Sequence, residues 1–220
     1  MNTLKYILKK YGLRLSERIE IPNVGRDNLA SLFSELNFKV GVEVGVEHGL
    51  YSEVLCKANP QMKIYGVDPW ESLEICIKNS PKRRTDNHSS QKTCDRYYEN
   101  AMRRLAPYPN YKILKEYSVD AVKRFDDASL DFVYIDANHE YSFVIDDITM
   151  WSKKVRKRGI VSGHDYYNTS SSSKVTMQVK RAVNDYVRKN HIKPLIIWGA
   201  HAVSPGVTRD KWRSWMWVKT

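Results

Sequence analysis

Short apolar runs alternate with stretches of helical periodicity along most of the chain. Nearly continuous apolar runs are typical of strands covered on both faces of a parallel sheet, and apolar residues three and four positions apart predict a helix with one buried face. The predicted strands are 40–44, 63–68, 111–115, 131–136, 159–162, 194–198 and 212–219. The predicted helices are 27–36, 50–58, 95–105, 119–125, 143–156 and 175–190.

This alternation predicts an α/β fold in which residues 27–220 form a single domain around a doubly wound sheet of seven strands. The last two strands have no helical pattern between them, so we expect them to pair as an antiparallel edge. Residues 1–26 are expected to form an N-terminal cap helix and a linker, because their apolar residues recur at helical spacing. The polar, basic segment 71–93 has no clear period, and we interpret it as a mobile substrate loop, with a plain surface insertion as the alternative.

Charge and cysteine content narrow the classes of function. The net charge of +11 is compatible with an anionic partner or with a solvated basic surface. We favour the solvated surface, because no basic patch is interleaved with aromatic residues as in nucleic-acid-reading motifs. No apolar run approaches the roughly 20 residues of a membrane helix. The three cysteines form no CxxC pair and the N-terminus lacks signal-peptide features, which favours a reducing, cytoplasmic location.

The stretch VGVEVGVEHGLYS leads from the strand at 40–44 into a helix through a turn that contains Gly45 and Gly49. Glycines at such a turn let the backbone approach a nucleotide-type ligand closely. The spacing differs from the G-x-G-x-x-G of dinucleotide sites, and the carboxylates of Glu43 and Glu47 would repel a pyrophosphate. They would accept the ammonium and sulfonium of S-adenosylmethionine. Asp68, which follows the next strand, is suited to the two ribose hydroxyls.

A second group of polar residues follows the strands at 131–136 and 159–162. Asp136 and Asp165 are expected at the same edge of the sheet, where open α/β sheets bind ligands. Two carboxylates there suit a hard divalent cation such as Mg²⁺, and the nearby His139 could remove a proton near neutral pH. Each residue alone has an ordinary structural explanation, as a helix cap or a hydrogen-bonded loop histidine.

Together these residues resemble a known family. The stretches VGVEVGVEHGLYS, GVDPW, SLDFVYIDANHEYSFVIDDITMW and GIVSGHDY resemble the class I S-adenosylmethionine-dependent methyltransferases, which have a Rossmann-like fold. Among these, the branch that includes macrocin-type sugar O-methyltransferases and glycan-associated methyltransferases is the most similar. The resemblance covers roughly residues 28–167.

The resemblance implies a strand order of 3-2-1-4-5-7-6, with strand 7 antiparallel, when the seven predicted strands are numbered along the chain. It places Ser118 near the adenine of the cofactor, and Glu43, Gly45 and Gly49 at the methionine end. The cofactor-binding candidates are Glu43, Gly45, Glu47, Gly49, Ser52, Asp68, Pro69, Trp70, Ser118 and Asp136.

The metal-dependent sugar enzymes of this branch have an acid at the position of Asp136, a catalytic histidine at that of His139, and an acidic pair after the fifth strand. Here the pair reads His164 and Asp165, so Asp165 matches and His164 departs from the pattern. An imidazole in place of a carboxylate would leave a ligand position to water or favour a softer metal. The metal-ligand candidates are Asp136, Asp165 and His164, and the catalytic candidates are His139 and Asp136.

These residues predict an S-adenosylmethionine-dependent O-methyltransferase that acts on a sugar or other polyol with the help of Mg²⁺ or another divalent cation. Tyr141 and Tyr166 are candidates to stack on the acceptor. A catechol-like phenol would suit the same residues. A nucleic-acid acceptor is disfavoured, since the Asn/Asp-Pro-Pro-Tyr tetrapeptide of N-methylating enzymes is absent. A non-catalytic cofactor-binding protein is the remaining alternative. A homodimer and a partner glycosyltransferase are suggested by analogy with the family.

Overall fold

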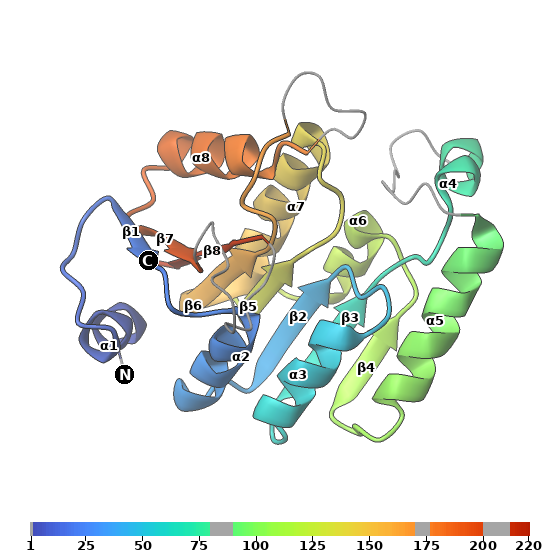
Figure 1. The fold of residues 1–220 in the computed structure, drawn as a ribbon, viewed down its shortest axis with the longest axis horizontal. Coiled ribbons are helices and arrows are strands. Elements are labelled where there is room, and N and C mark those ends of the chain that lie inside the picture. The colour runs from blue at the N-terminus through green and yellow to red at the C-terminus, as the bar shows by residue number, and fades with distance from the viewer. Residues whose placement is uncertain (1, 80–89, 170–176, 200–211) are drawn as a thin grey trace.

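The computed structural model describes residues 2–79, 90–169, 177–199 and 212–220, and it shows one twisted sheet covered by helices on both faces (Figure 1). The strands are β1 (Arg18–Ile21), β2 (Val40–Val44), β3 (Lys63–Val67), β4 (Tyr111–Leu114), β5 (Leu130–Ile135), β6 (Val155–Gly163), β7 (Leu195–Trp198) and β8 (Ser214–Val218). The helices are α1 (Thr3–Lys10), α2 (Arg26–Glu35), α3 (Leu50–Ala58), α4 (Leu73–Asn79), α5 (Gln91–Leu105), α6 (Ser118–Ala121), the short 3₁₀ helix η1 (Val122–Arg124), α7 (Tyr141–Lys154) and α8 (Val179–Lys189).

The strand order confirms the predicted topology and adds one strand. The eight strands are ordered β1-β7-β8-β6-β5-β2-β3-β4. Read from β4, the seven predicted strands follow the order 3-2-1-4-5-7-6, and β8 runs antiparallel to both β6 and β7. The carboxyl ends of the parallel strands β2, β3, β5 and β6 therefore meet at one edge of the sheet, where such folds bind ligands.

The eighth strand, β1, lies within the segment expected to be a helix and a linker. Its four residues alternate between exposed and buried, with Ile19 and Ile21 turned inward. The strand pairs in parallel with β7, with Ile21 opposite Trp198. The expectation that the last two strands form the edge of the sheet is therefore wrong, although they do pair in antiparallel fashion. The strand alternates charged and apolar residues, so no continuous apolar run marks it in the sequence.

Two apolar cores hold the helices against the sheet, one on each face. On one face α2 packs on the centre of the sheet, where the rings of Phe33 and Phe132 stack with centroids 4.0 Å apart. On the other face the indole of Trp151 in α7 is fully buried among residues of β5, β6 and α8. Because both faces of β5 are covered, all six of its residues are buried, as its apolar run predicts.

The predicted loop at 71–93 is partly helical. The chain forms α4 and begins α5 within this range, and residues 80–89 lie outside the described residues, so a mobile substrate loop stays a prediction. Gln91 joins the two ends of the segment, because its side chain accepts a hydrogen bond from Ser72 N at 2.9 Å and donates one to the Trp70 carbonyl at 3.0 Å. In the part of the chain that the structure describes, no helix has the length and apolar character needed to cross a bilayer.

The packing of β1 predicts that Ile21→Ala lowers the free energy of unfolding by about 2–4 kcal/mol, because the change removes a buried side chain from the sheet and leaves a cavity. Leu15→Ala is the control: Leu15 precedes the same strand and is 66% exposed, so its loss is expected to change stability by no more than about 0.5 kcal/mol. Urea denaturation measures both. Equal small effects would mean that β1 does not belong to the core sheet.

Candidate active site

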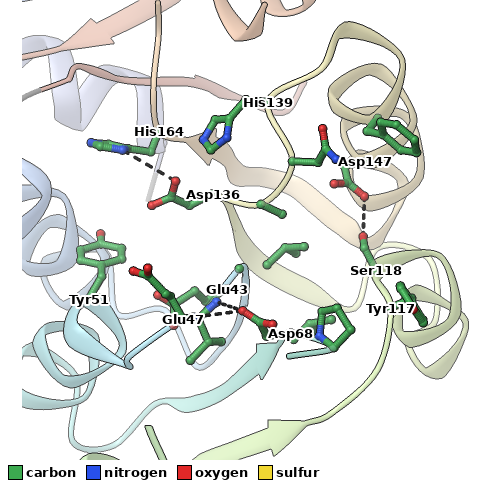
Figure 2. A pocket seen from close by; sticks show the side chains of 18 of the residues that line it. Glu43, Glu47, Tyr51, Asp68, Tyr117, Ser118, Asp136, His139, Asp147 and His164 are labelled. Carbon is green, nitrogen blue, oxygen red and sulfur yellow. Dashed lines mark hydrogen bonds and ion pairs between the residues drawn. The ribbon is translucent and has the colours of Figure 1, made fainter. Parts of the chain in front are cut away.

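A cavity of about 660 Å³ opens at the carboxyl ends of β2, β3, β5 and β6. It is lined by the turn after β2, the residues that follow β3 and β5, the start of α6 and one side of α7 (Figure 2). Most of the predicted cofactor and metal residues line this one cavity. The fold therefore brings two groups of residues that are far apart in the sequence to a common space.

The turn after β2 requires glycine at position 45. Gly45 has a φ of +93°, and a Cβ placed there would lie 1.9 Å from the carbonyl oxygen of Asp136. The end of β5 is held against this turn by a hydrogen bond from Asp136 N to the Val44 carbonyl, 2.7 Å long. No side chain larger than hydrogen fits between the two segments, so Gly45 sets how closely the cofactor turn approaches Asp136.

Asp68 organises the same turn from β3. One carboxylate oxygen accepts hydrogen bonds from the backbone N–H groups of Val46 and Glu47, both at 3.0 Å, and the other accepts from Trp70 N at 2.8 Å. The indole N–H of Trp70 donates to the Glu47 carbonyl at 2.9 Å, and Trp70 is only 2% exposed. Asp68, Pro69 and Trp70 thus form one wall of the cavity and fix the turn that faces it.

Glu43 lies in the floor of the cavity, at the end of β2. Its carboxyl group accepts hydrogen bonds from the hydroxyl of Tyr111 at 2.8 Å and from that of Ser52, and burial raises its pKa to about 8. Ser52 itself does not line the cavity, and Gly49, at φ +73°, precedes α3 behind the turn. These two predicted cofactor residues therefore support the wall from behind.

Asp136, His139 and Asp165 come together on the β5 and β6 side. Each offers a ligand atom, and these atoms all lie within 4.8 Å of one another. The His139 Nε2 atom is 2.6 Å from a carboxylate oxygen of Asp165. Burial opposes ionisation of Asp165, but hydrogen bonds from His139 and His164 hold its pKa below the usual range. Two carboxylates and one imidazole at this spacing are a donor set that fits a divalent cation.

His164 and Arg26 flank this group. The His164 Nδ1 atom lies 3.1 Å from one oxygen of Asp165 and 3.7 Å from one of Asp136. Arg26, the first residue of α2, places its Nη1 atom 3.2 Å from the other oxygen of Asp136 and its guanidinium over the ring of Tyr51. Burial raises the pKa of Asp136, while His164, Arg26 and His139 act in the opposite direction. Arg26 was missed because it has no motif of its own and lies outside the quoted stretches.

The side of the cavity near α6 contains Ser118 and a second residue that the sequence analysis missed, Asp147. The Ser118 hydroxyl donates to Asp147 Oδ1 and accepts from Trp151 Nε1 at 2.8 Å. Burial raises the pKa of Asp147 to about 7. A signal was present in the sequence, because Asp147 falls on the same helical face as Val144, Ile148 and Trp151, where a charged residue is unexpected.

The two predicted acceptor residues do not reach the cavity, and the expectation for them is corrected. Tyr166 is 1% exposed, and its hydroxyl donates to Asn184 in α8 at 2.6 Å. Tyr141 begins α7 and donates to Asp185 of α8 at 3.2 Å. Both hydroxyl groups bond to side chains of α8, the helix that covers this face of the sheet. Trp212, which precedes β8, and Phe143 of α7 are aromatic residues that do line the cavity.

A family model described as a methyltransferase domain matches residues 42–166, more than half of the chain. The chain therefore belongs to this family, and it is a methyltransferase. The matched segment runs from β2 to the residue after Asp165, so it contains the cofactor turn and the group of Asp136, His139 and Asp165.

Solved structures share the fold at low sequence identity. An O-methyltransferase from Bacillus cereus in complex with SAH is 12% identical, with a TM-score of 0.59 over 100% of this chain and 91% of that one. An O-methyltransferase from Streptomyces achromogenes that is involved in tomaymycin synthesis, in complex with SAM, is 13% identical, with a TM-score of 0.55 over 100% and 91%. A comparison with curated proteins finds no match.

The close approach at Gly45 predicts that Gly45→Ala lowers the free energy of unfolding by much more than the strain of its positive φ alone. Gly199→Ala is the matched control, since Gly199 has a φ of +105° but a Cβ there would meet nothing nearer than 3.4 Å. Strain at φ alone is expected to cost about 1–2 kcal/mol in both variants, and the clash with Asp136 adds at least about 2 kcal/mol in Gly45→Ala. Equal losses in urea denaturation would contradict the proposed contact.

Proposed function

We propose that the protein transfers the methyl group of S-adenosylmethionine to a hydroxyl oxygen of a sugar or another polyol. The observation that carries the proposal is that one cavity contains both the turn of Gly45 and Asp68 and the group of Asp136, His139 and Asp165. The first set suits an adenosyl cofactor, and the second suits activation of a hydroxyl group. Reactants bound at the two sets would lie side by side, which is the main requirement for transfer between them.

The chemistry of the cofactor wall favours a cationic methyl donor. Glu43, Glu47, Asp68 and Asp136 surround the turn, and a ligand with an ammonium and a sulfonium would complement these acids where a pyrophosphate would be repelled. Asp68 has its oxygens directed at the turn and lies in the wall, so it can hold the ribose hydroxyls while it keeps the turn in place. Pro69, Trp70 and Ser118 complete the proposed cofactor site.

Asp136 and Asp165 would hold a divalent cation. His164 Nδ1, 3.1 Å from Asp165, would join them as a nitrogen ligand after it loses the proton that it donates to Asp165. Such a cation supplies a Lewis acid that lowers the pKa of an acceptor hydroxyl. His139 is the proposed base. When its Nε2–H donates to Asp165, its Nδ1 atom is left as the acceptor for the hydroxyl proton, and Asp165 stabilises the imidazolium that results.

The acceptor class is the least constrained part of the proposal. A sugar is favoured by the resemblance to the glycan-associated branch, and vicinal hydroxyls suit a site with two carboxylates. A catechol-like phenol has the same pair of neighbouring oxygens, so both classes belong in an acceptor screen. A cytoplasmic location, a homodimer and a partner glycosyltransferase are parts of the same proposal.

The cofactor assignment predicts that the protein binds S-adenosylhomocysteine and that Asp68→Asn weakens this binding at least about tenfold, because hydrogen bonds to a charged group are each worth about 1.5–3 kcal/mol. Isothermal titration calorimetry measures both affinities. Asp127→Asn is the control, since it makes the same change at an exposed aspartate that pairs with Lys154. A wild-type protein that shows no binding would overturn the proposed function.

The metal assignment is tested with Mn²⁺ as a paramagnetic substitute for Mg²⁺. Titration followed by electron paramagnetic resonance is expected to show one bound ion, and Asp165→Ala should weaken its binding at least about tenfold, because it removes one of two carboxylate ligands. Asp127→Ala should leave the affinity unchanged. For the reaction itself, full activity of Asp165→Ala in excess EDTA would rule out metal assistance while leaving the methyltransferase assignment intact.

A further inference from the structure

One exposed apolar side chain lies in the wall of the cavity. Among the described residues the strongly exposed large apolar side chains are Leu15, Leu50 and Met102, and of these only Leu50, 57% exposed, lines the cavity. A single exposed leucine on an open surface is ordinary. A leucine that faces a ligand cavity keeps apolar surface in water until a ligand covers it, so this position favours an apolar ligand group.

The start of α3 presents Leu50 to the cavity. Gly49, in the left-handed region with a φ of +73°, ends the cofactor turn, and Leu50 is the first residue of the helix. The next residue, Tyr51, is 6% exposed, and its hydroxyl donates to the Arg26 carbonyl at 3.2 Å. The buried tyrosine therefore fixes the start of the helix, while the leucine, about 100° away around the helix axis, stays at the surface of the cavity.

Leu50 lies toward the proposed catalytic group and away from the proposed adenine end. The ring of Tyr51 has the guanidinium of Arg26 over it at 5.3 Å, and the Nη1 atom of Arg26 is 3.2 Å from Asp136. Figure 2 shows Tyr51 and Ser118 on opposite sides of the cavity. A molecule bound at Asp136 can therefore extend past Tyr51 to Leu50 without entering the space of the cofactor's adenosyl group.

Two rings extend this wall. His48, two residues before Leu50, packs on Tyr97 of α5 with ring centroids 4.0 Å apart, and both residues line the cavity. The Nε atom of Arg104 donates to the His48 carbonyl at 3.2 Å and ties the turn to α5. We call His48, Leu50 and Tyr97 the apolar rim. A leucine beside two packed rings is a surface that suits hydrocarbon.

We propose that the apolar rim binds an apolar substituent of the acceptor, so that the preferred acceptor is a glycoside with an apolar aglycone and not a free sugar. The inference rests on the proposed function, because it takes the acceptor hydroxyl to be bound at Asp136 and His139. The aglycone then covers Leu50. Each methylene group that becomes fully buried there strengthens binding about fourfold.

The test measures how affinity depends on the length of an apolar chain. Methyl, butyl and hexyl β-D-glucosides are titrated by ligand-observed nuclear magnetic resonance in the presence of S-adenosylhomocysteine. The wild-type protein is expected to bind the hexyl form at least about tenfold more tightly than the methyl form. Leu50→Gln should reduce this ratio to within about threefold, because an amide replaces the apolar surface.

Leu15→Gln is the matched control. It makes the same change at a leucine that is 66% exposed and does not line the cavity, so it should retain the wild-type ratio. Both substitutions are at exposed positions, where the effect on folding is small. The readout is a ratio of two affinities for one variant, so a partial loss of folded protein does not imitate the expected result.

A wild-type ratio near one would overturn the inference, and so would a wild-type ratio retained in Leu50→Gln. An equal fall in Leu15→Gln would show that the alkyl chain binds outside the cavity. The affinity for S-adenosylhomocysteine is measured in parallel. A loss of that affinity in Leu50→Gln would assign the leucine to the cofactor site and overturn the inference, whereas no binding to the wild-type protein would contradict the proposed function.

Discussion

The close contact between the turn after β2 and the end of β5 is the constraint on which the site depends. The carbonyl of Asp136 occupies the space that a side chain at position 45 would need. The backbone hydrogen bond from Asp136 to Val44 holds the two segments at that separation. As a result, Asp136 of the proposed catalytic group is positioned by the same backbone that forms the cofactor turn. The two halves of the site are therefore coupled through this contact.

Around this contact the protein holds several acids that burial alone would disfavour. Partners of different kinds offset this cost in part. Asp68 accepts backbone N–H groups, Glu43 accepts two hydroxyls, and Asp136 has the guanidinium of Arg26 beside it. Asp147 keeps one oxygen toward the cavity. An acidic cavity in a chain whose net charge is +11 indicates that the local arrangement, and not the overall charge, selects a cationic ligand.

Much of the sheet could be predicted because most of its strands are short apolar runs separated by periodic helices. The range 40–44 was predicted with the bounds that β2 has. By contrast, β1 alternates charged and apolar residues, and its pairing with β7 is a tertiary effect that no local pattern encodes. The order of the seven predicted strands came from the family resemblance.

The site was predicted where residues follow a strand directly, since the carboxyl ends of parallel strands meet. Asp68, Asp136 and Asp165 were found in this way. The rule fails for Tyr166, because the chain turns at Asp165, with a φ of +53°, and directs the tyrosine into the core. It also misses Arg26, which reaches the cavity from the start of a helix. The pairing of Ser118 with Asp147 depends on how α7 packs against α6, which the sequence does not specify.

The most direct test of the central claim is a crystal structure of the protein with S-adenosylhomocysteine bound. We expect the adenosyl group between Asp68 and Ser118, with the sulfur facing Asp136 and His139. That placement would direct the methyl group of the donor at the proposed acceptor site. Density for the ligand elsewhere, or a sulfur turned away from Asp136, would contradict the claim that one cavity joins the cofactor turn to the catalytic group.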